Sequence, residues 1–541
     1  MRSVGRQRAQ RSGARGQAAG TWRQRCRLLG LAGSLAIAVG GFGAGALPAA
    51  ARDLRAWSTP AVALVYLGLT LLVAAWLRLG RLVAAGETRP RDLVVTLLWW
   101  AAPLVLAPPM YSRDVYSYLA QGTIAVKGMD PYAVGPAVLG GSLANDIAPV
   151  WLHSAAPYGP LFLAGAAAVM RVAGGHAALA VLGMRLLALA GLALLVYCVP
   201  RLAARSGTAP ARALWLGVLN PLVLLHLVAG AHNDALMVAF LVAGLLLAVR
   251  GRPALGVAVL ALAVLVKAPA VVALAFVVPL WADRMRGWPR PAALAAAALG
   301  TAVVATGTVV AVTALTGNGY GWIGLLRSPG VVRNGLSITT DLGLLAGFVG
   351  HALTGVDPEP AVAMWRFTGA GLALAITALM LWRALPAPPR LHPAGAFGLA
   401  MSAIVLLSPV VHPWYPLWGF IPLAATSHDR RIRRCIVVLS VVAAYVVMPD
   451  GGDRTAAHVL AGGAGLLLGL LGLFLGGFRP RLAQRPGQVL QGQRVPIDAQ
   501  PADHSGGHGG DHRMVPELLP GVDVGDVHLD QRPPQQGAGV P

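Results

Sequence analysis

The chain has 541 residues, of which 56% are hydrophobic and only 12% are charged. A soluble domain carries about a quarter charged residues, so this composition excludes an ordinary soluble enzyme and a disordered scaffold. The apolar residues fall into runs of roughly 16 to 28 residues, a length that crosses a bilayer core about 30 Å thick. The sequence therefore predicts an all-α polytopic membrane protein.

The formal net charge of +22 comes almost entirely from arginine. The arginines do not form one patch, as a nucleic-acid site would require, but lie in short segments between the apolar runs. Such segments mark the cytoplasmic ends of membrane spans. They are residues 78–91, 201–212, 284–290, 430–434 and 479–485.

Three regions follow from this pattern. Residues 1–27 are basic and are expected to form a cytoplasmic tail, and residues 28–478 form the multi-span core. Residues 479–541 are rich in Gly, Pro, Gln and Asp and predict a disordered cytoplasmic tail, because they cannot bury a core. Three histidines in this tail, at 504, 508 and 512, have the spacing of a helical metal site, but the flanking glycines disfavour a helix.

The first apolar run, Leu28–Ala51, has an alternative interpretation as a cleaved signal peptide, with a small-residue site at residues 49–51. The run is longer than the apolar part of a signal peptide, which has about 7 to 15 residues. We therefore expect an uncleaved outward span. The three cysteines, Cys26, Cys198 and Cys435, each lie beside a basic segment, have no metal-binding spacing and need no disulfide.

The next runs define the first outer loop. Pro60–Leu77 returns to the inside and Leu93–Tyr111 crosses outward again, which leaves Ser112–Pro157 on the outer face. Long loops often carry function. Tyr158–Val172 is short for a span, and we expect it to lie in the interface or to re-enter.

Later runs bring further polar residues to the same face. Ala213–Ala229 is expected to cross outward, which places His232 outside. Ala254–Leu280 is too long for one upright span, and Lys267-Ala268-Pro269 interrupts it. A proline there predicts two short helices that meet near the outer face, with one tilted helix as the alternative.

The remaining runs complete about 13 crossings. Pro291–Leu315 leads to a second outer loop, Leu336–Leu353 is again short enough to be interfacial, and Pro393–Leu407 leads outward to His412. The polar and aromatic motifs therefore converge on the outer face.

The outer loop opens with Ser112-Arg113-Asp114-Val115-Tyr116, directly after a span. A partly desolvated carboxylate at the membrane boundary has a raised pKa, which suits a general base. Two structural interpretations stay open from the residues alone: Asp114 pairs with Arg113, or it caps a helix.

Five motifs, in this order, resemble one known family. They are Ser112–Tyr118, Gly128–Tyr132, Ala156–Pro160, His232–Leu236 and His412–Pro416. The set is similar to the actinobacterial polyprenol-phosphomannose-dependent α-1,6-mannosyltransferases, which are GT-C glycosyltransferases. The resemblance covers most of the membrane core and neither terminal tail.

The resemblance implies a GT-C-like bundle in the plasma membrane with its active site on the outer face. It implies that Asp114 is the catalytic base that activates an acceptor hydroxyl, with inversion at a mannose carried by polyprenyl phosphate. The acceptor would be a lipid-anchored α-1,6-mannan, of the lipomannan or lipoarabinomannan backbone type. The expected substrate-binding residues are Arg113, Tyr116, Asp130, Tyr132, His232, Asn233, Asp234, Lys267, His412, Trp414 and Tyr415.

Several of these residues have a plainer interpretation. Lys267 suits the leaving phosphate because a lysine is costly in lipid, but it could instead extend to the headgroups. His232-Asn233-Asp234 could cap a helix, and the motif around His412 could be an interfacial aromatic belt. Arg327 and Arg333, in the predicted second outer loop, are weaker candidates for binding the phosphate, because an arginine on such a loop is usually solvated.

Metal and substrate choices are only partly decided by the sequence. No Asp-x-Asp pair occurs in the outer loop, so we expect no obligatory cofactor, although a divalent metal is possible. One alternative keeps the fold but takes another sugar, such as arabinofuranose. Another is a transporter or lipid-linked sugar flippase, for which an inverted repeat and paired intramembrane charges would be expected.

Overall fold

The computed structural model describes residues 2–325, 335–452 and 455–476, and only helices and connecting segments occur among them. Six described helices are long and apolar enough to cross a membrane, or seven if one bent pair forms a single span. Six further apolar helices have 10 to 17 residues. The prediction of an all-α polytopic membrane protein is confirmed, whereas the count of about 13 spans stays a prediction.

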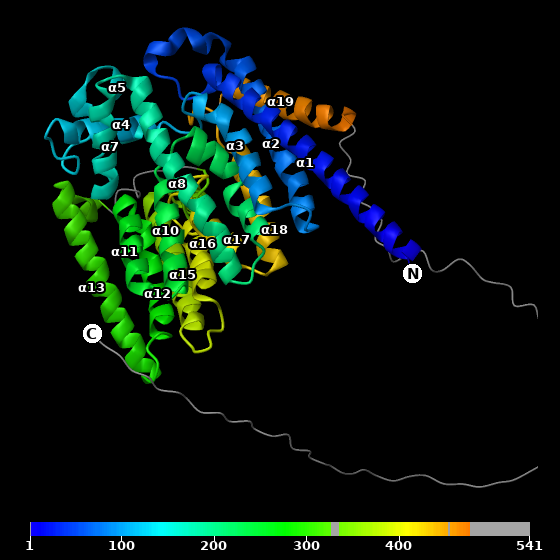
Figure 1. Ribbon diagram of the computed structural model, residues 1–541. Coiled ribbons are helices and arrows are strands. Elements are labelled where there is room, and N and C mark those ends of the chain that lie inside the picture. Colours follow the sequence, from blue (N-terminus) through cyan, green and yellow to red (C-terminus); the bar gives the residue numbers. More distant parts are fainter. Residues whose placement is uncertain (1, 326–334, 453–454, 477–541) are drawn as a thin grey trace, which may run out of the picture. The chain divides into compact units, whose positions relative to one another are not determined.

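The N-terminal helices pack side by side (Figure 1). They are α1 (Arg2–Ala44), η1 (Ala49–Trp57), α2 (Ser58–Ala84) and α3 (Pro90–Leu106). Helix α1 continues through residue 27, where we expected a tail to end, and its residues Gln17–Ala44 are long and apolar enough to span. The Trp100 Nε1 of α3 donates to the Arg27 carbonyl at 3.0 Å, so α1 is part of the folded core.

The predicted span Leu93–Tyr111 is wrong at its end, because α3 stops at Leu106. Ala107 is extended and is followed by Pro108 and Pro109, and a residue before a proline disfavours the helical conformation. The polar segment begins earlier than expected for this reason.

The predicted outer loop is itself folded. It contains α4 (Asp114–Val126), η2 (Pro136–Leu139), α5 (Gly141–Asp146) and α6 (Pro149–Leu152). Helix α4 packs along α7 (Pro160–Ala173), which leads into α8 (Ala177–Arg205). The segment predicted to form the outer loop is thus a small helical layer joined to the core (Figure 1).

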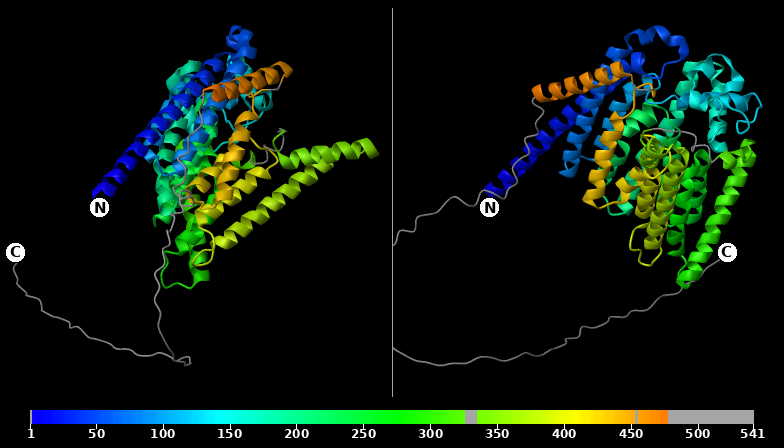
Figure 2. Two further views of the ribbon diagram at one scale, coloured as in Figure 1. Left: turned by 90° about the vertical axis from the view of Figure 1, so that its right-hand side faces the viewer. Right: turned by 180° about the vertical axis from the view of Figure 1, so that it is seen from behind.

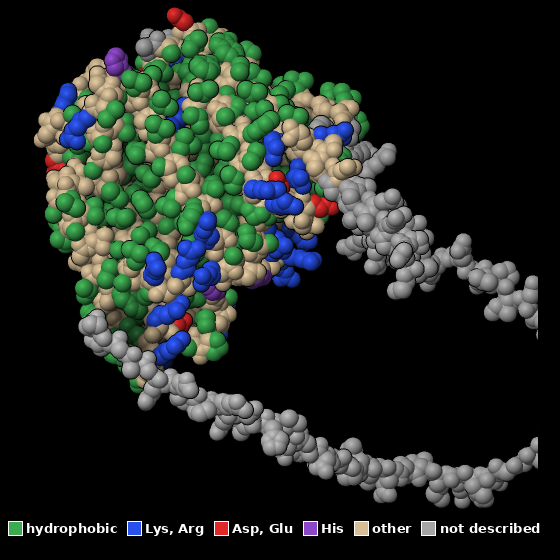
Figure 3. Space-filling model, viewed as in Figure 1, with side chains coloured by type: hydrophobic (Ala, Val, Ile, Leu, Met, Phe, Trp, Pro, Cys, Tyr) green, Lys and Arg blue, Asp and Glu red, His purple; other side chains and the backbone are tan. Residues whose placement is uncertain are grey.

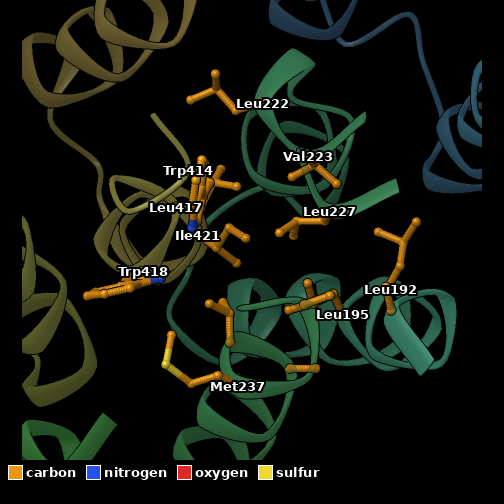
Figure 4. Packing of buried hydrophobic residues seen from close by; sticks show 14 of the residues in the cluster. Leu192, Leu195, Leu222, Val223, Leu227, Met237, Trp414, Leu417, Trp418 and Ile421 are labelled. Carbon is orange, nitrogen blue, oxygen red and sulfur yellow. The ribbon is translucent and has the colours of Figure 1, made fainter. Parts of the chain in front are cut away.

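The predicted straight span Ala213–Ala229 is bent. After α9 (Pro210–Ala213), the chain forms two π-helical segments, η3 (Leu214–Val218) and η4 (Val223–Ala229), at an angle of 62°. Asn220 and Pro221 separate them, and a proline interrupts the hydrogen bonds of the helix. In Figure 4, Leu222, Val223 and Leu227 of this region pack toward Trp414, Leu417 and Ile421.

Lys267 lies at the turn between two short helices, which is the break that Pro269 predicts. Helices α10 (Asp234–Val249), α11 (Pro253–Val266) and α12 (Val272–Ala282) follow one another, with η5 (Ala268–Val271) at the turn. Lys267 is extended, with φ −155° and ψ 124°, and lies beside Asp234 at the start of α10. At the other end of the hairpin, the Arg284 guanidinium reaches the Val249 carbonyl. The two-helix prediction is therefore confirmed and the single tilted helix is excluded.

The C-terminal part consists of longer, more exposed helices and a short buried one. They are α13 (Arg290–Thr316), α14 (Ile338–Thr354), α15 (Glu359–Ala384), α16 (Pro393–Leu406), α17 (Leu417–Thr426), α18 (Arg430–Tyr445) and α19 (Ala456–Leu475). Helix α14 packs along α15, and this pair projects from its neighbours (Figure 2). Buried α17 packs against α8, α10, α16 and η3, and it begins directly after the motif that contains His412.

Candidate active site

Asp114 is the first residue of α4, and its position depends on the strained backbone of Tyr111, three residues earlier. Tyr111 has a positive φ of 65°, which is uncommon for a residue with a side chain. Its amide donates to the Pro449 carbonyl at 2.6 Å, which fixes the turn. The Ser112 hydroxyl then accepts from the Asp114 amide at 3.0 Å. The turn therefore delivers Asp114 to the start of the helix.

Arg113 does not pair with Asp114. Its guanidinium donates to the carbonyl oxygens of Asp146, at 2.9 Å, and Leu47, at 3.2 Å. Tyr116 donates its hydroxyl to the Ala46 carbonyl at 2.7 Å. Both residues tie α4 to the segment after α1, and the hydrogen-bond partners of the Arg113 guanidinium among the described residues are neutral carbonyls.

His232 joins the second motif to Asp114. Its Nδ1 lies 3.6 Å from the Asp114 Oδ2 and 3.4 Å from the Tyr118 hydroxyl. The same hydroxyl lies within hydrogen-bonding distance, 3.4 Å, of the Asn233 Oδ1. Ala231, just before, has a positive φ of 52°, so a strained turn positions this motif too.

Asp234 and Lys267 form a buried ion pair beside these groups. The Lys267 ammonium lies 3.0 Å and 2.9 Å from the two carboxylate oxygens, and Trp418 Nε1 donates to Oδ1 at 2.6 Å. The Asp234 side chain is fully buried and that of Lys267 is 12% exposed. Asp234 is thus an internal acceptor, and the ion pair holds the Lys267 ammonium beside it.

Aromatic rings cover this polar cluster. His232 stacks on Trp414 at 3.8 Å between ring centroids, and His412 stacks on the same indole at 4.6 Å. Tyr415 stacks on Trp418 at 4.2 Å. The Lys267 ammonium lies 4.9 Å from the Tyr415 ring centroid, within reach of a cation–π interaction.

Asp114 opens onto a cavity of about 540 Å³. Arg113, His412 and Trp414 line it as well, so the first and last motifs meet there. Trp414 Nε1 is buried and has no hydrogen-bond partner among the described residues. A carboxylate, a guanidinium and an aromatic face around one cavity can bind a sugar and an anionic group together.

Burial determines the charge states at this cavity. It raises the pKa of Asp114 to about 6, and the nearby Lys267 charge and the Ser112 hydrogen bond oppose that rise. Burial lowers the pKa of His412 to about 3, with a smaller effect of the Lys267 charge in the same direction. Burial also lowers the pKa of His232 well below its usual range. At neutral pH, therefore, Asp114 is charged and both histidines are neutral.

Asp130 and Tyr132 do not line the Asp114 cavity. Asp130 accepts from the Tyr132 amide at 2.8 Å, which is the local turn that an Asp before a proline favours. Asp130 lines a different cavity, of about 640 Å³, together with Arg171 and Asn318. The structure does not bring these two predicted residues to Asp114.

Three site residues were missing from the sequence prediction: Tyr118, Tyr158 and Trp418. Tyr118 and Tyr158 are buried neighbours, with ring centroids 5.4 Å apart, and Lys267 lies 5.9 Å from the Tyr158 ring. Tyr118 is four residues after Asp114, and Trp418 is three after Tyr415, so helical spacing could have indicated both.

No group of three or more His, Cys, Asp or Glu side chains has a metal-binding arrangement in the described ranges. Cys26, Cys198 and Cys435 are free thiols. Arg327, Arg333 and the three tail histidines lie outside the described residues.

Comparisons with known proteins match most of the chain to one family. Residues 27–283 match the family model described as alpha-(1→6)-mannopyranosyltransferase, N-terminal domain, and residues 339–474 match the MptB C-terminal domain. The chain is 37% identical over 473 residues to a probable alpha-(1→6)-mannopyranosyltransferase of Mycolicibacterium smegmatis. The matched region covers 80% of this chain and 84% of that relative. The chain belongs to the alpha-(1→6)-mannopyranosyltransferase family.

Two further members of this mannosyltransferase family show similar coverage. Alpha-(1→6)-mannopyranosyltransferase A of Mycobacterium tuberculosis is 36% identical, over 78% of this chain and 84% of its own length. Alpha-(1→6)-mannopyranosyltransferase B of Corynebacterium glutamicum is 32% identical, over 84% of this chain and 81% of its own length. No solved structure matches the chain.

Proposed function

We propose that this protein transfers mannose from polyprenyl phosphomannose to an α-1,6-mannan acceptor at the outer face of the plasma membrane. The observation that carries the proposal is the cavity in which the Asp114 carboxylate lies with Arg113, His412 and Trp414. Membership of the mannosyltransferase family supports the sugar and the linkage. The acceptor would be a lipid-anchored mannan of the lipomannan type.

Asp114 would act as the general base. Its carboxylate takes the proton from the acceptor hydroxyl as that oxygen attacks the anomeric carbon of the donor. The bond between that carbon and the phosphate oxygen breaks, and polyprenyl phosphate leaves with the bonding electron pair. A β-linked donor would thus give an α-linked product in one displacement.

Arg113 is suited to the charge that develops on the leaving phosphate. Phosphodiester cleavage adds one negative charge to the lipid phosphate, and a fixed cation stabilises a transition state in which that charge forms. The guanidinium lines the Asp114 cavity, and its described partners are two neutral carbonyls. Arg113 can therefore meet an incoming phosphate without first losing a carboxylate partner.

Lys267 would act mainly as a positioning residue. Its ammonium is engaged by Asp234, and it is not among the residues that line the Asp114 cavity. Its positive charge opposes the rise in the pKa of Asp114, so it tunes the base. Its direct contact with the leaving phosphate stays a prediction.

A lipid-linked sugar flippase is the second candidate, because the buried pair of Lys267 and Asp234 is of a kind that transporters use. An enzyme of the same fold that takes another polyprenyl-phosphate sugar, such as arabinofuranose, is a closer variant. These candidates differ in the product that each would form.

The test is an assay with purified membranes that contain the full chain, labelled polyprenyl phosphomannose and a short α-1,6-mannoside. We expect the acceptor to be lengthened by one or more α-linked mannoses, with much less transfer from a polyprenyl-phosphate arabinofuranose donor. Preferential use of the arabinofuranose donor would change the sugar in this proposal. Movement of intact donor across the membrane with no glycosidic product would identify a flippase and overturn the proposal.

A further inference from the structure

A third, chemically distinct cavity lies at the arginine-rich start of α18, whereas the Asp114 cavity lies beyond the end of that helix. It measures about 520 Å³ and is formed by the end of α2, by α9 with η3, and by the start of α18. Figure 3 shows Lys and Arg side chains gathered in the lower part of the view, beneath a broad hydrophobic surface. The cavity is lined by Gly80, Val83, Ala84, Arg212, Trp215, Arg430, Arg433, Arg434, Val437 and Val438.

The polar part of this cavity is strongly cationic. All four of its charged lining residues are arginines, and they come from two separate elements, α9 and α18. Arg433 donates to the His428 carbonyl at 2.6 Å, whereas no described partner is recorded for the other three guanidinium groups. Asp429, directly before α18, caps that helix by accepting from the Arg431 amide at 2.7 Å, and its carboxylate favours the charge of Arg433 less than Arg212 and Arg430 oppose it.

This arrangement is unfavourable without an anion. Three of the arginines lie in the first two turns of α18, where the positive end of the helix dipole repels cations. Arg212 and Arg430 are also close enough to Arg433 to act on its charge. A phosphate group would relieve both repulsions and accept hydrogen bonds from several guanidinium groups at once.

The other wall of the cavity is apolar and rigid. Trp215 and Trp76 stack at 5.1 Å, and each indole donates to the backbone carbonyl of the other, at 2.9 and 3.0 Å. A Cβ on Gly80 would collide with the Trp215 ring, so glycine is needed for this ring to lie there. Beyond the ring, α18 exposes Val438 and Val442 in the direction away from the arginines.

We infer that this cavity binds one membrane phospholipid with an anionic headgroup, with the phosphate among Arg212, Arg430, Arg433 and Arg434 and an acyl chain along Trp215, Val437 and Val438. Charge complementarity and the continuous apolar wall both favour a lipid over a free anion. Basic pockets between membrane helices bind anionic headgroups in this way. The inference does not depend on the proposed mannosyl transfer, because the site shares no lining residue with the Asp114 cavity.

The test is native mass spectrometry of the full chain in detergent, titrated with dioleoyl phosphatidylglycerol or dioleoyl phosphatidylcholine. We expect one phosphatidylglycerol to bind at least tenfold more tightly than phosphatidylcholine. The triple variant Arg430→Gln, Arg433→Gln, Arg434→Gln should lose that preference. Addition of 10-fold excess inorganic phosphate should not displace the lipid, because phosphate lacks the apolar contacts.

The matched control is the triple variant Arg205→Gln, Arg252→Gln, Arg286→Gln, which removes the same charge from exposed arginines outside the cavity. It should keep the preference within about twofold. The single variants Arg430→Gln and Arg434→Gln, at exposed positions, provide the same comparison if the triple variant does not fold. Equal binding of both lipids by the unmodified chain, equal losses in the two triple variants, or displacement by phosphate would each overturn the inference.

Discussion

The geometry at Asp114 distinguishes a salt bridge with Arg113 from a carboxylate that is free to act as a base, which the Arg-Asp sequence alone cannot do. Arg113 turns toward the carbonyls of Leu47 and Asp146, so the carboxylate next to it is left for the cavity and for His232. A surface salt bridge between the neighbours would have explained the motif without any chemistry. Among the described residues the two side chains form no ion pair with each other, so the salt-bridge interpretation does not hold and the proposal of Asp114 as the base stands.

Asp114→Asn keeps the shape of the side chain but removes its ability to take a proton. General-base catalysis typically supplies about 10²–10⁴-fold, so mannosyl transfer should fall by that factor while expression and donor binding are kept. Initial rates with labelled donor measure the effect. Asp130→Asn is the control, because Asp130 lines another cavity and serves a local turn. A variant at Asp114 with near-normal turnover, or a larger loss at Asp130, would refute the assignment.

The pH profile gives an independent check on the same residue. Because burial raises the pKa of Asp114 to about 6, the carboxylate is protonated as the pH falls below that value and can no longer act as a base. We expect kcat/KM to fall about tenfold per pH unit below about 6 and to be level above it. His412, whose pKa is lowered to about 3, does not titrate in that range. A profile that is flat down to pH 5 would contradict this account.

The pair of Lys267 and Asp234 should be sensitive to loss of either partner. Lys267→Met leaves the fully buried Asp234 carboxylate without its cation, and such a change typically costs about 3–5 kcal/mol. The double variant Lys267→Met, Asp234→Asn removes both charges and should recover part of the loss. Thermal unfolding in detergent measures both. If the double variant loses as much stability as the two single variants together, the pair does not act as a unit.

The sequence predicts which residues have functional side chains better than it predicts which of those side chains lie in contact in the folded protein. Asp114, His232 and Trp414 were all expected at one site, and they do lie together. The partnership of Lys267 with Asp234 was not foreseen, because it depends on how the hairpin returns beside α10. Asp130 lies away from Asp114 because α4 separates the two by 13 helical residues, a rise of about 20 Å, and its role in substrate binding stays a prediction.

Breaks within the predicted spans explain most differences between the hydropathy pattern and the helices of the structure. The break at Lys267 was predictable because a proline follows a charge inside an apolar run. The 62° bend between η3 and η4 was not, because hydropathy does not detect a turn between two apolar segments. The bend carries the chain to Ala231 and His232, so it has a direct effect on the site.

Close packing of α1 on α2 provides an element-scale prediction. A Cβ on Gly33 would lie 2.6 Å from the Gly68 carbonyl oxygen, and one on Gly68 would lie 2.5 Å from that of Gly33. Small residues allow membrane helices to approach in this way. Gly33→Leu should therefore reduce the yield of folded protein, measured by size-exclusion chromatography. Gly307→Leu, at a helical position with open space, should not. An unaffected Gly33→Leu variant would instead support removal of α1 as a signal peptide.

At the scale of the whole molecule, sidedness connects the composition to the function. The basic segments predict that the start of α18 is cytoplasmic and that the layer containing α4 and α5 is outside. In intact cells, an impermeant thiol reagent should label Ser142→Cys in a Cys435→Ser background, since residue 142 is exposed. The native Cys435, also exposed, should react only after permeabilisation. The reverse pattern would invert the topology.

The measurement that tests the central claim most directly combines sidedness with chemistry. Sealed right-side-out vesicles that contain the full chain and labelled polyprenyl phosphomannose receive an impermeant α-1,6-mannoside from outside. We predict a labelled, longer α-1,6-mannoside in the external medium without permeabilisation, and its near-absence with Asp114→Asn. Product that forms only after the vesicles are opened, or at the same rate in the Asp114 variant, would contradict the proposal of an outward-facing mannosyltransferase with Asp114 as its base.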